Sequence, residues 1–248
     1  MAKEVAGGIP GHVCNDTFII LRAGTDDGAG VAVVSGTGAN CVGAGRDGSQ
    51  HRVGGLLSEL GDYGGAYDLA IDALRASRRG KDGRAEPTML HDMIVSRFGL
   101  SEIEDIADLY APGGVGVQIE EIVRMVFEAA NKRDAIAIGI LTKAGKELGL
   151  CARLVAERLF GKDEEFPLVM GGSVLQKGSS PHFRETIVAD VKKVFQLIKP
   201  VLLDCEPVSG AAMYAFDTLE KERGPDDEAR KKDFQFWLKG ALCLTERI

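Results

Sequence analysis

The sequence predicts an α/β fold built on a mixed sheet, and three observations lead to this prediction. Residues 31–34 are four small or β-branched apolar residues, the pattern of a buried strand. Two further strand patterns, 41–45 and 50–53, follow with a turn signal at 46–49 between them, as expected of an antiparallel three-strand meander. After a long helical stretch, a strand–helix–strand order returns over 166–203.

The helical stretch between these strand patterns covers about 87–161. Pro87 is suited to a helix start, and Ser101 with Glu104 has the spacing of a capping box. Asp134 is placed to cap a long helix with a continuous apolar stripe. We therefore expect a helical insertion between the two groups of strands.

The composition is that of a globular protein. The 248 residues are 45% hydrophobic and 27% charged, and the net charge of −7 argues against nucleic-acid or anionic-membrane binding. No apolar run approaches the roughly 20 residues of a membrane span, and the first residues show no signal-peptide core. The five cysteines form no CxxC pair and the four histidines show no ligand spacing, so we expect a cytoplasmic protein with buried thiols and no metal site.

The first strand pattern ends in Ser-Gly-Thr-Gly, at residues 35–38. Two glycines leave backbone N–H groups open to an anion, and Thr37 adds a hydroxyl donor between them. The same residues also suit a plain hairpin turn. The motif alone leaves phosphate binding and a tight turn as alternatives.

Asn15 and Asp16 end a short predicted strand and open a helix that closes at Gly24. Asp16 has two readings. It caps this helix, or its carboxylate faces a binding site from the end of the strand.

Three features now occur in a fixed order: the Gly-Thr-Gly turn, a strand ending in Gly-Gly-Ser at 171–173, and a helix opening with Gly-Ala-Ala at 210–212. This order resembles the actin/hexokinase-like ATPase superfamily. The run VAVVSGTGANCVGAGRDGSQHRVGG, followed by LGDYGGAYDLA, resembles the BadF/BadG/BcrA/BcrD ATPase family, which includes N-acetylglucosamine kinases. The resemblance covers about 15–216. It implies a ribonuclease H-like lobe with helices on both sides of the sheet.

The resemblance also implies ATP and Mg²⁺ as cofactors, with four groups of ATP-binding residues. The turn would hold the β- and γ-phosphates, the Gly-Gly-Ser strand end would leave room for base and ribose, one helix would border the nucleotide, and one glycine would lie at an interdomain hinge. In that order the groups are Gly36, Thr37 and Gly38; Gly171, Gly172 and Ser173; Ala144 and Gly145; and Gly210.

For the substrate, the resemblance implies a sugar or amino sugar. Asp16 would take the proton of the attacking hydroxyl, and Asn15, Gly55 and Asp62 would contact the sugar. The family usually has Gly-Gly-Trp-Gly and Gly-Asp-Glu-Gly in its sugar loop. This chain has Gly-Gly-Leu-Leu and Gly-Asp-Tyr-Gly, which leaves the identity of the sugar open.

The family's first phosphate loop, of the Asp-Gly-Gly-Gly-Thr type, has no counterpart before Asp16. We therefore expect residues 1–28 to be a remnant of an N-terminal lobe, 29–216 to be the C-terminal lobe, and 217–248 to be a helical tail. The missing lobe would belong to a longer reading frame or come from elsewhere.

Three functions follow as alternatives. The first is an ATP-dependent sugar kinase or ATPase, whose full site needs the other lobe and whose assembly allows a homodimer. The second is a non-catalytic sugar- or nucleotide-binding module. The third is the activator branch of the same family, which needs a cysteine-ligated iron–sulfur cluster between subunits; its candidates here are Cys41, Cys151 and Cys205.

Overall fold

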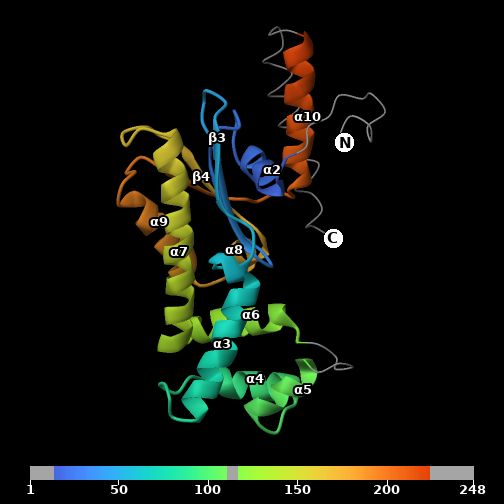
Figure 1. Ribbon diagram of the computed structural model, residues 1–248, viewed down its shortest axis with the longest axis vertical. Helices are drawn as coiled ribbons and strands as arrows, with labels where there is room; N and C mark the ends of the chain where they lie inside the picture. Colours follow the sequence, from blue (N-terminus) through green and yellow to red (C-terminus); the bar gives the residue numbers. More distant parts are fainter. Residues whose placement is uncertain (1–13, 111–116, 224–248) are drawn as a thin grey trace.

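A mixed sheet of five strands is the centre of the computed structural model, which describes residues 14–110 and 117–223 (Figure 1). Strands β1, β2 and β3 pair antiparallel in sequence order, and β4 and β5 continue the sheet in parallel from β1, giving the order β3-β2-β1-β4-β5. The predicted α/β class and three-strand meander are confirmed. The strands are β1 (Gly30–Ser35), β2 (Ala39–Ala44), β3 (Gln50–Gly54), β4 (Pro167–Gly171) and β5 (Lys199–Leu202).

Alternating side chains of β1 supply two separate cores, one on each face of the sheet. Val31 and Val33 pack into the larger core, whereas Ala32 belongs to the smaller one. Figure 1 shows the corresponding helices: α7 and α9 cover one face, and α2 and α10 lie on the other. Their bounds are α2 (Asp16–Ala23), α7 (Ala135–Leu159), α9 (Pro181–Lys192) and α10 (Val208–Arg223).

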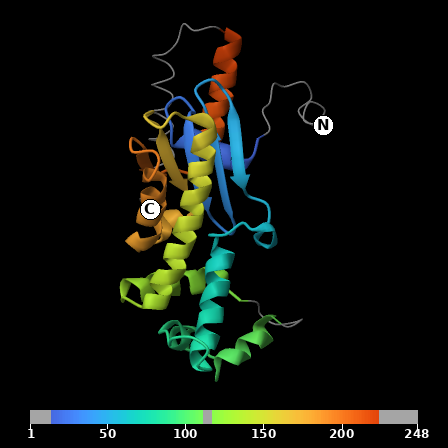
Figure 2. The same cartoon turned by 60° about the vertical axis from the view of Figure 1, so that its left-hand side comes forward.

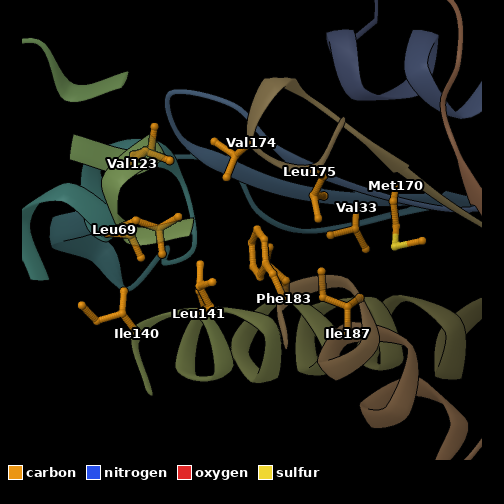
Figure 3. Close-up of a cluster of buried hydrophobic side chains, with 14 of the residues drawn as sticks. Val33, Leu69, Val123, Ile140, Leu141, Met170, Val174, Leu175, Phe183 and Ile187 are labelled. Carbon is orange, nitrogen blue, oxygen red and sulfur yellow. The ribbon is translucent and has the colours of Figure 1, made fainter. Parts of the chain in front are cut away.

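The predicted insertion is helical, and its first helices extend the molecule beyond one end of the strands (Figure 2). Helix α7 begins in this region and then runs along the sheet, so that one helix joins both parts. Figure 3 shows the shared core, in which Phe183 of α9 lies between Leu141 of α7 and Val33 of β1. The remaining helices are α3 (Ala66–Lys81), α4 (Leu90–Phe98), α5 (Ile106–Tyr110), α6 (Ile119–Asn131), α8 (Ser173–Lys177) and the 3-10 turns η1 (Ser58–Leu60) and η2 (Ile103–Asp105).

Two predicted helix starts in the insertion were wrong. Helix α4 begins at Leu90 and not at Pro87. The predicted Ser101–Glu104 capping box is displaced by one residue, because the Asp105 carboxylate accepts the N–H groups of Ser101 and Glu102 at 3.0 and 2.9 Å. The predicted cap of α7 is confirmed, since the Asp134 carboxylate accepts the N–H of Ala137.

The strand predicted to lead into Asn15 and Asp16 was also wrong for the described residues. Cys14 and Asn15 are not in a strand, and the helix begins at Asp16. The Asn15 side chain accepts the N–H of Thr17 at 3.1 Å, so that Asn15 caps α2.

Helix α10 continues across the predicted boundary between 216 and 217, and the division into lobes stays a prediction. The segment before Cys14 and the tail after Arg223 lie outside the described residues. Within 14–110 and 117–223, no helix has both the length and the apolar character needed to cross a membrane.

Candidate functional site

The Gly-Thr-Gly turn lies between β1 and β2, and its outer side is open. Thr37 and Gly38 are exposed. A Cβ added to Gly36 or Gly38 would have no atom of the described structure within 4 Å beyond the adjoining residues, and neither glycine has a positive φ. Neither internal packing nor backbone conformation therefore requires glycine at these two positions.

The inner side of the turn is bonded to the start of α3. The N–H groups of Ala66 and Tyr67 donate to the carbonyl oxygens of Gly36 and Thr37 at 2.8 and 3.2 Å. Two of the N–H groups that a helix start leaves without intrahelical partners are thereby satisfied. The buried Ser35 hydroxyl donates to the carbonyl of Gly64 at 2.6 Å. The turn is fixed in place while its outer face stays free.

Asp68 holds the segment that leads into α3. One oxygen of its carboxylate accepts the N–H groups of Gly64 and Gly65, both at 3.0 Å, and the other accepts the Ser58 hydroxyl at 2.7 Å. Gly65 packs so closely that a Cβ there would lie 2.5 Å from Cα of Gly38. Sequence reasoning missed Asp68, although an acidic residue three positions after a helix cap is a recognisable signal.

The Gly-Gly-Ser end of β4 meets the same turn. Gly172 has φ +90°, and a Cβ there would stand 2.4 Å from the carbonyl oxygen of Ser35. A Cβ on Gly171 would stand 2.6 Å from the Ile20 side chain of α2. The structure thus brings together the predicted phosphate and adenosine segments, 36–38 and 171–173, which are far apart in the sequence.

A cavity of about 450 Å³ opens beside this junction, within the usual size range of small-molecule pockets. Ala66 at the start of α3, Phe127 of α6 and Ser173 at the start of α8 line it, so that three elements contribute walls. Lys177 and Asn131 add polar groups, and Asn131 donates to the Ser179 hydroxyl at 2.9 Å. Sequence reasoning missed the α6 contribution, because a helical apolar stripe gives no sign of which residues border a cavity. The other lining residues are Glu120, Val123, Arg124, Glu128, Lys132, Val174, Gly178 and Ser179.

The start of α2 lies next to the beginning of β2. The Asn15 side-chain oxygen accepts an N–H of Asn40 at 2.9 Å, and the same Asn40 nitrogen donates to the Thr17 hydroxyl at 2.8 Å. Asp16 is exposed in the first turn of the helix, with a carboxylate oxygen 3.5 Å from the Thr17 hydroxyl. Because Asn15 performs the capping, the Asp16 carboxylate is left at the surface, where the positive end of the helix favours negative charge.

The predicted sugar loop follows β3 and folds back on itself. The Asp62 carboxylate accepts the N–H of Leu56, and Arg52 donates to the carbonyl oxygens of Gly54 and Gly55. Gly55 has φ +78°, and a Cβ there would lie 2.2 Å from the side-chain oxygen of Asn40. Asn40 therefore touches both the α2 start and the sugar loop, and it brings Asn15, Gly55 and their neighbours into one place.

Tyr63, the residue after Asp62, is anchored outside the loop. Its hydroxyl donates to Asp72 at 2.5 Å, and the Lys143 ammonium donates to the same carboxylate oxygen at 2.8 Å while lying 4.0 Å from the centre of the Tyr63 ring. Burial, followed by the bond to Asp72, raises the pKa of Tyr63. Burial alone would raise the pKa of Asp72, but the hydrogen bonds from Lys143 and Tyr63 outweigh it and lower that pKa. The cluster attaches the loop to α3 and α7.

The remaining predicted ATP-binding residues lie where helices pack together. Ala144 is fully buried in the large core, and a Cβ on Gly145 would stand 2.8 Å from the carbonyl oxygen of Phe183 in α9. A Cβ on Gly210 would stand 1.9 Å from the carbonyl oxygen of Ile19 in α2. Nucleotide contact by Ala144, Gly145 and Gly210 stays a prediction; the structure shows the helix contacts that the two glycines allow.

The three candidate cluster cysteines lie on two faces of the sheet. Cys41 belongs to the large core near Cys151, and Cys205 belongs to the small core, with its sulfur 3.2 Å from the Ser209 hydroxyl. Burial, then the nearby Glu147 and Asp62, raises the pKa of Cys151 to about 11. Across residues 14–110 and 117–223, no three His, Cys, Asp or Glu side chains converge to hold a metal ion.

Comparison with known proteins matches residues 10–215 to the BadF/BadG/BcrA/BcrD ATPase family. An N-acetylmuramic acid/N-acetylglucosamine kinase of Clostridium acetobutylicum is 34% identical over 164 residues, which is 66% of this chain and 54% of that protein. An N-acetyl-D-glucosamine kinase of Dictyostelium discoideum is 30% identical over 209 residues, which is 82% of this chain and 65% of that protein. The chain thus spans between half and two thirds of the length of these relatives.

Two solved structures share the fold. A candidate N-acetylglucosamine kinase from Chromobacterium violaceum has a TM-score of 0.60 at 23% identity, over 85% of this chain and 69% of that one. A second, from Porphyromonas gingivalis, has a TM-score of 0.55 at 19% identity, over 80% of this chain and 64% of that one. The chain therefore shares the fold of these two structures, which confirms the predicted fold class.

Proposed function

Because the chain belongs to the BadF/BadG/BcrA/BcrD ATPase family, we propose that it binds ATP and acts in phosphoryl transfer to a hydroxyl of an amino sugar. The observation that carries the proposal is the open face of the phosphate turn. Gly36 and Gly38 need glycine neither for packing nor for a positive φ. Close approach of a ligand is a physical reason for glycine there.

The nucleotide would lie across the junction of β1, β4 and α3. The turn offers backbone N–H groups and the Thr37 hydroxyl to the β- and γ-phosphates. Gly172 packs against Ser35 and so places the cavity next to the turn, with Ser173 on its wall. The cavity has room for base and ribose, and the Phe127 ring supplies an apolar wall for the base.

Mg²⁺ would be carried in with the nucleotide. In phosphoryl-transfer sites this ion keeps several waters and binds through one or two carboxylates together with substrate phosphates. Since no cluster of side chains in residues 14–110 and 117–223 is placed to hold an ion alone, its ligands here would be mainly the phosphates and water. The ion would neutralise the charge of the phosphates during transfer.

Asp16 would act as the general base. Its carboxylate is exposed at the start of α2, and the hydrogen bonds of Asn15 and Asn40 fix the backbone that carries it. As the sugar oxygen bonds to the γ-phosphorus and the bond to ADP breaks, the hydroxyl proton passes to Asp16. The products are a sugar phosphate and ADP.

The sugar would lie between Asp16 and the loop from Gly54 to Asp62. The relatives are named for N-acetylglucosamine and N-acetylmuramic acid, which supports an amino sugar as the substrate class. Tyr63 stands where the family usually has Glu, and its hydroxyl bonds to Asp72. We therefore infer that sugar recognition on this side depends on Asp62.

Calorimetry with Mg-ATP tests the phosphate turn. Thr37→Ala removes the hydroxyl donor, and we expect about tenfold weaker binding, the effect of one hydrogen bond to a charged group. Thr37→Ser keeps the hydroxyl and is the matched control, with affinity near that of the parent. Equal ATP affinity in parent and Thr37→Ala would contradict the assignment.

ATP consumption with N-acetylglucosamine tests the catalytic step. Asp16→Asn should lower turnover by about 10²- to 10⁴-fold, the usual contribution of a general base. Asp163→Asn is the matched control. It removes the same charge from the exposed loop before β4, at the end of the strand opposite Gly171, and it should leave turnover unchanged. ATP binding without turnover in the parent would support the non-catalytic module instead.

A further inference from the structure

Asn40 carries a buried oxygen with no hydrogen-bond partner among the described residues. Its amide nitrogen is fully used, because it donates to the Asn15 oxygen and to the Thr17 hydroxyl. Buried polar atoms in folded proteins are nearly always hydrogen-bonded. The unpaired oxygen of Asn40 therefore needs an explanation.

The orientation of this amide follows from its neighbours. The Asn15 oxygen already accepts the N–H of Thr17, which identifies it as an acceptor. The group that faces it must be a donor, so the nitrogen of Asn40 points to Asn15 and its oxygen points the other way. The free acceptor thus faces the loop after β3.

The loop itself covers this acceptor. Asn40 is paired with Gly54 in the β2–β3 ladder, and a Cβ on Gly55 would lie 2.2 Å from the Asn40 oxygen. Gly54 and Gly55 have φ of 76° and 78°, conformations that glycine can leave at low cost. The loop turns back at these two glycines and lies over Asn40.

A second hydrogen-bond acceptor near Asn40, the Asp62 carboxylate, is bonded to the backbone of the loop. The Asp62 carboxylate accepts the N–H of Leu56. Leu56 and Leu57, in the same segment, have side chains that are 70% and 58% exposed. One oxygen of the Asp62 carboxylate is therefore bonded within the loop, while these two apolar side chains remain in water.

From these contacts we propose that Asn40 is a sugar-binding residue, whose side-chain oxygen accepts a hydrogen bond from a sugar hydroxyl when the loop moves at Gly54 and Gly55. The inference rests on the proposed function and extends it to a residue and a loop movement. In the same movement, a second hydroxyl of the sugar replaces the N–H of Leu56 as the donor to the Asp62 carboxylate. The ligand class is a polyol with neighbouring hydroxyl donors.

Asn40 also connects this contact to the reaction. Its nitrogen remains on Asn15 and Thr17, which flank Asp16 in sequence. A hydroxyl bound to the Asn40 oxygen is consequently placed beside the end of α2 that bears the proposed base. One side chain thus positions both the sugar and the helix start.

Calorimetry with N-acetylglucosamine and its 3-, 4- and 6-deoxy analogues tests the contact. Asn40→Ala should weaken N-acetylglucosamine binding about tenfold. For the one analogue that lacks the contacted hydroxyl, Asn40→Ala should cause no further loss. Thr17→Val is the matched control, because it removes a bond of the Asn40 nitrogen and leaves the oxygen; it should weaken all four sugars by the same factor. An equal loss for all sugars with Asn40→Ala, no loss, or no sugar binding by the parent would overturn the inference.

Hydrogen exchange of the parent chain gives a test that needs no variant. The Leu56 amide should exchange faster when N-acetylglucosamine is present, because its hydrogen bond to the Asp62 carboxylate is then broken. Unchanged or slower exchange would contradict the loop movement. Mg-ATP binding is measured on the same samples. If ATP binds while the sugar tests fail, this inference fails alone; if neither ligand binds, the proposed function fails as well.

Discussion

Two sets of glycines look alike in the sequence and have opposite surroundings in the structure. At Gly145 and Gly210 a Cβ would stand 2.8 and 1.9 Å from carbonyl oxygens of α9 and α2. At Gly36 and Gly38 a Cβ would meet no described atom within 4 Å beyond the adjoining residues. The first set lets helices pack closely, and the second leaves a surface uncovered. The close-packed glycines are therefore explained by helix contacts, whereas the open ones at the turn are explained by the ligand access that we propose.

The largest stability effect is expected at the α2–α10 contact. Gly210→Ala places a methyl group against the carbonyl of Ile19, and we expect a loss of about 3 kcal/mol in the free energy of unfolding, measured in urea. Gly139→Ala in α7 is the matched control, because a Cβ there meets nothing within 4 Å. It should stabilise the chain by about 0.5–1 kcal/mol through helix propensity. If Gly210→Ala and Gly139→Ala changed the free energy of unfolding by similar amounts, the distinction between close-packed and open glycines would be contradicted.

A smaller effect is expected at the Tyr63 anchor. The pKa of Asp72 is lowered in the folded chain, so its ionised form stabilises the fold above the unfolded pKa of about 4, and this contribution disappears as pH falls through the folded value. Lys143→Met should lower the free energy of unfolding at pH 7 by less than about 1 kcal/mol, because Lys143 is largely exposed. The difference from the parent should shrink as the pH falls below about 4. Urea unfolding at pH 7, 4 and 2 measures it, and a difference that persists unchanged at pH 2 would contradict this account.

The sheet and most helix positions were predictable because their signals are local. The apolar run of β1, the turns of the meander and the Asp134 cap each depend on residues next to one another in the chain. The capping box at Ser101 was wrong because Asp105, one position beyond Glu104, competes for the same N–H groups. Local patterns indicate that a helix starts, but neighbouring polar residues decide where.

The site was less predictable, because it depends on contacts between distant segments. Gly172 meets Ser35 and Asn40 meets Asn15 only after the sheet has formed. No spacing in the sequence indicates that the Asn40 oxygen lacks a donor or that Phe127 borders a cavity. Sequence reasoning could propose which residues bind the nucleotide, but the geometry that joins them is a property of the fold.

The most direct test of the difference between the two sets of glycines is one substitution in the open set, measured in two ways. Gly38→Ala should leave the free energy of unfolding within about 0.5 kcal/mol of the parent value, because the added Cβ has no described atom within 4 Å beyond the adjoining residues. The same variant should bind Mg-ATP about tenfold more weakly, equivalent to about 1.4 kcal/mol, because the added methyl group stands where a phosphate would approach. Unchanged ATP affinity would contradict the account, since the open glycines would then belong to a plain hairpin turn.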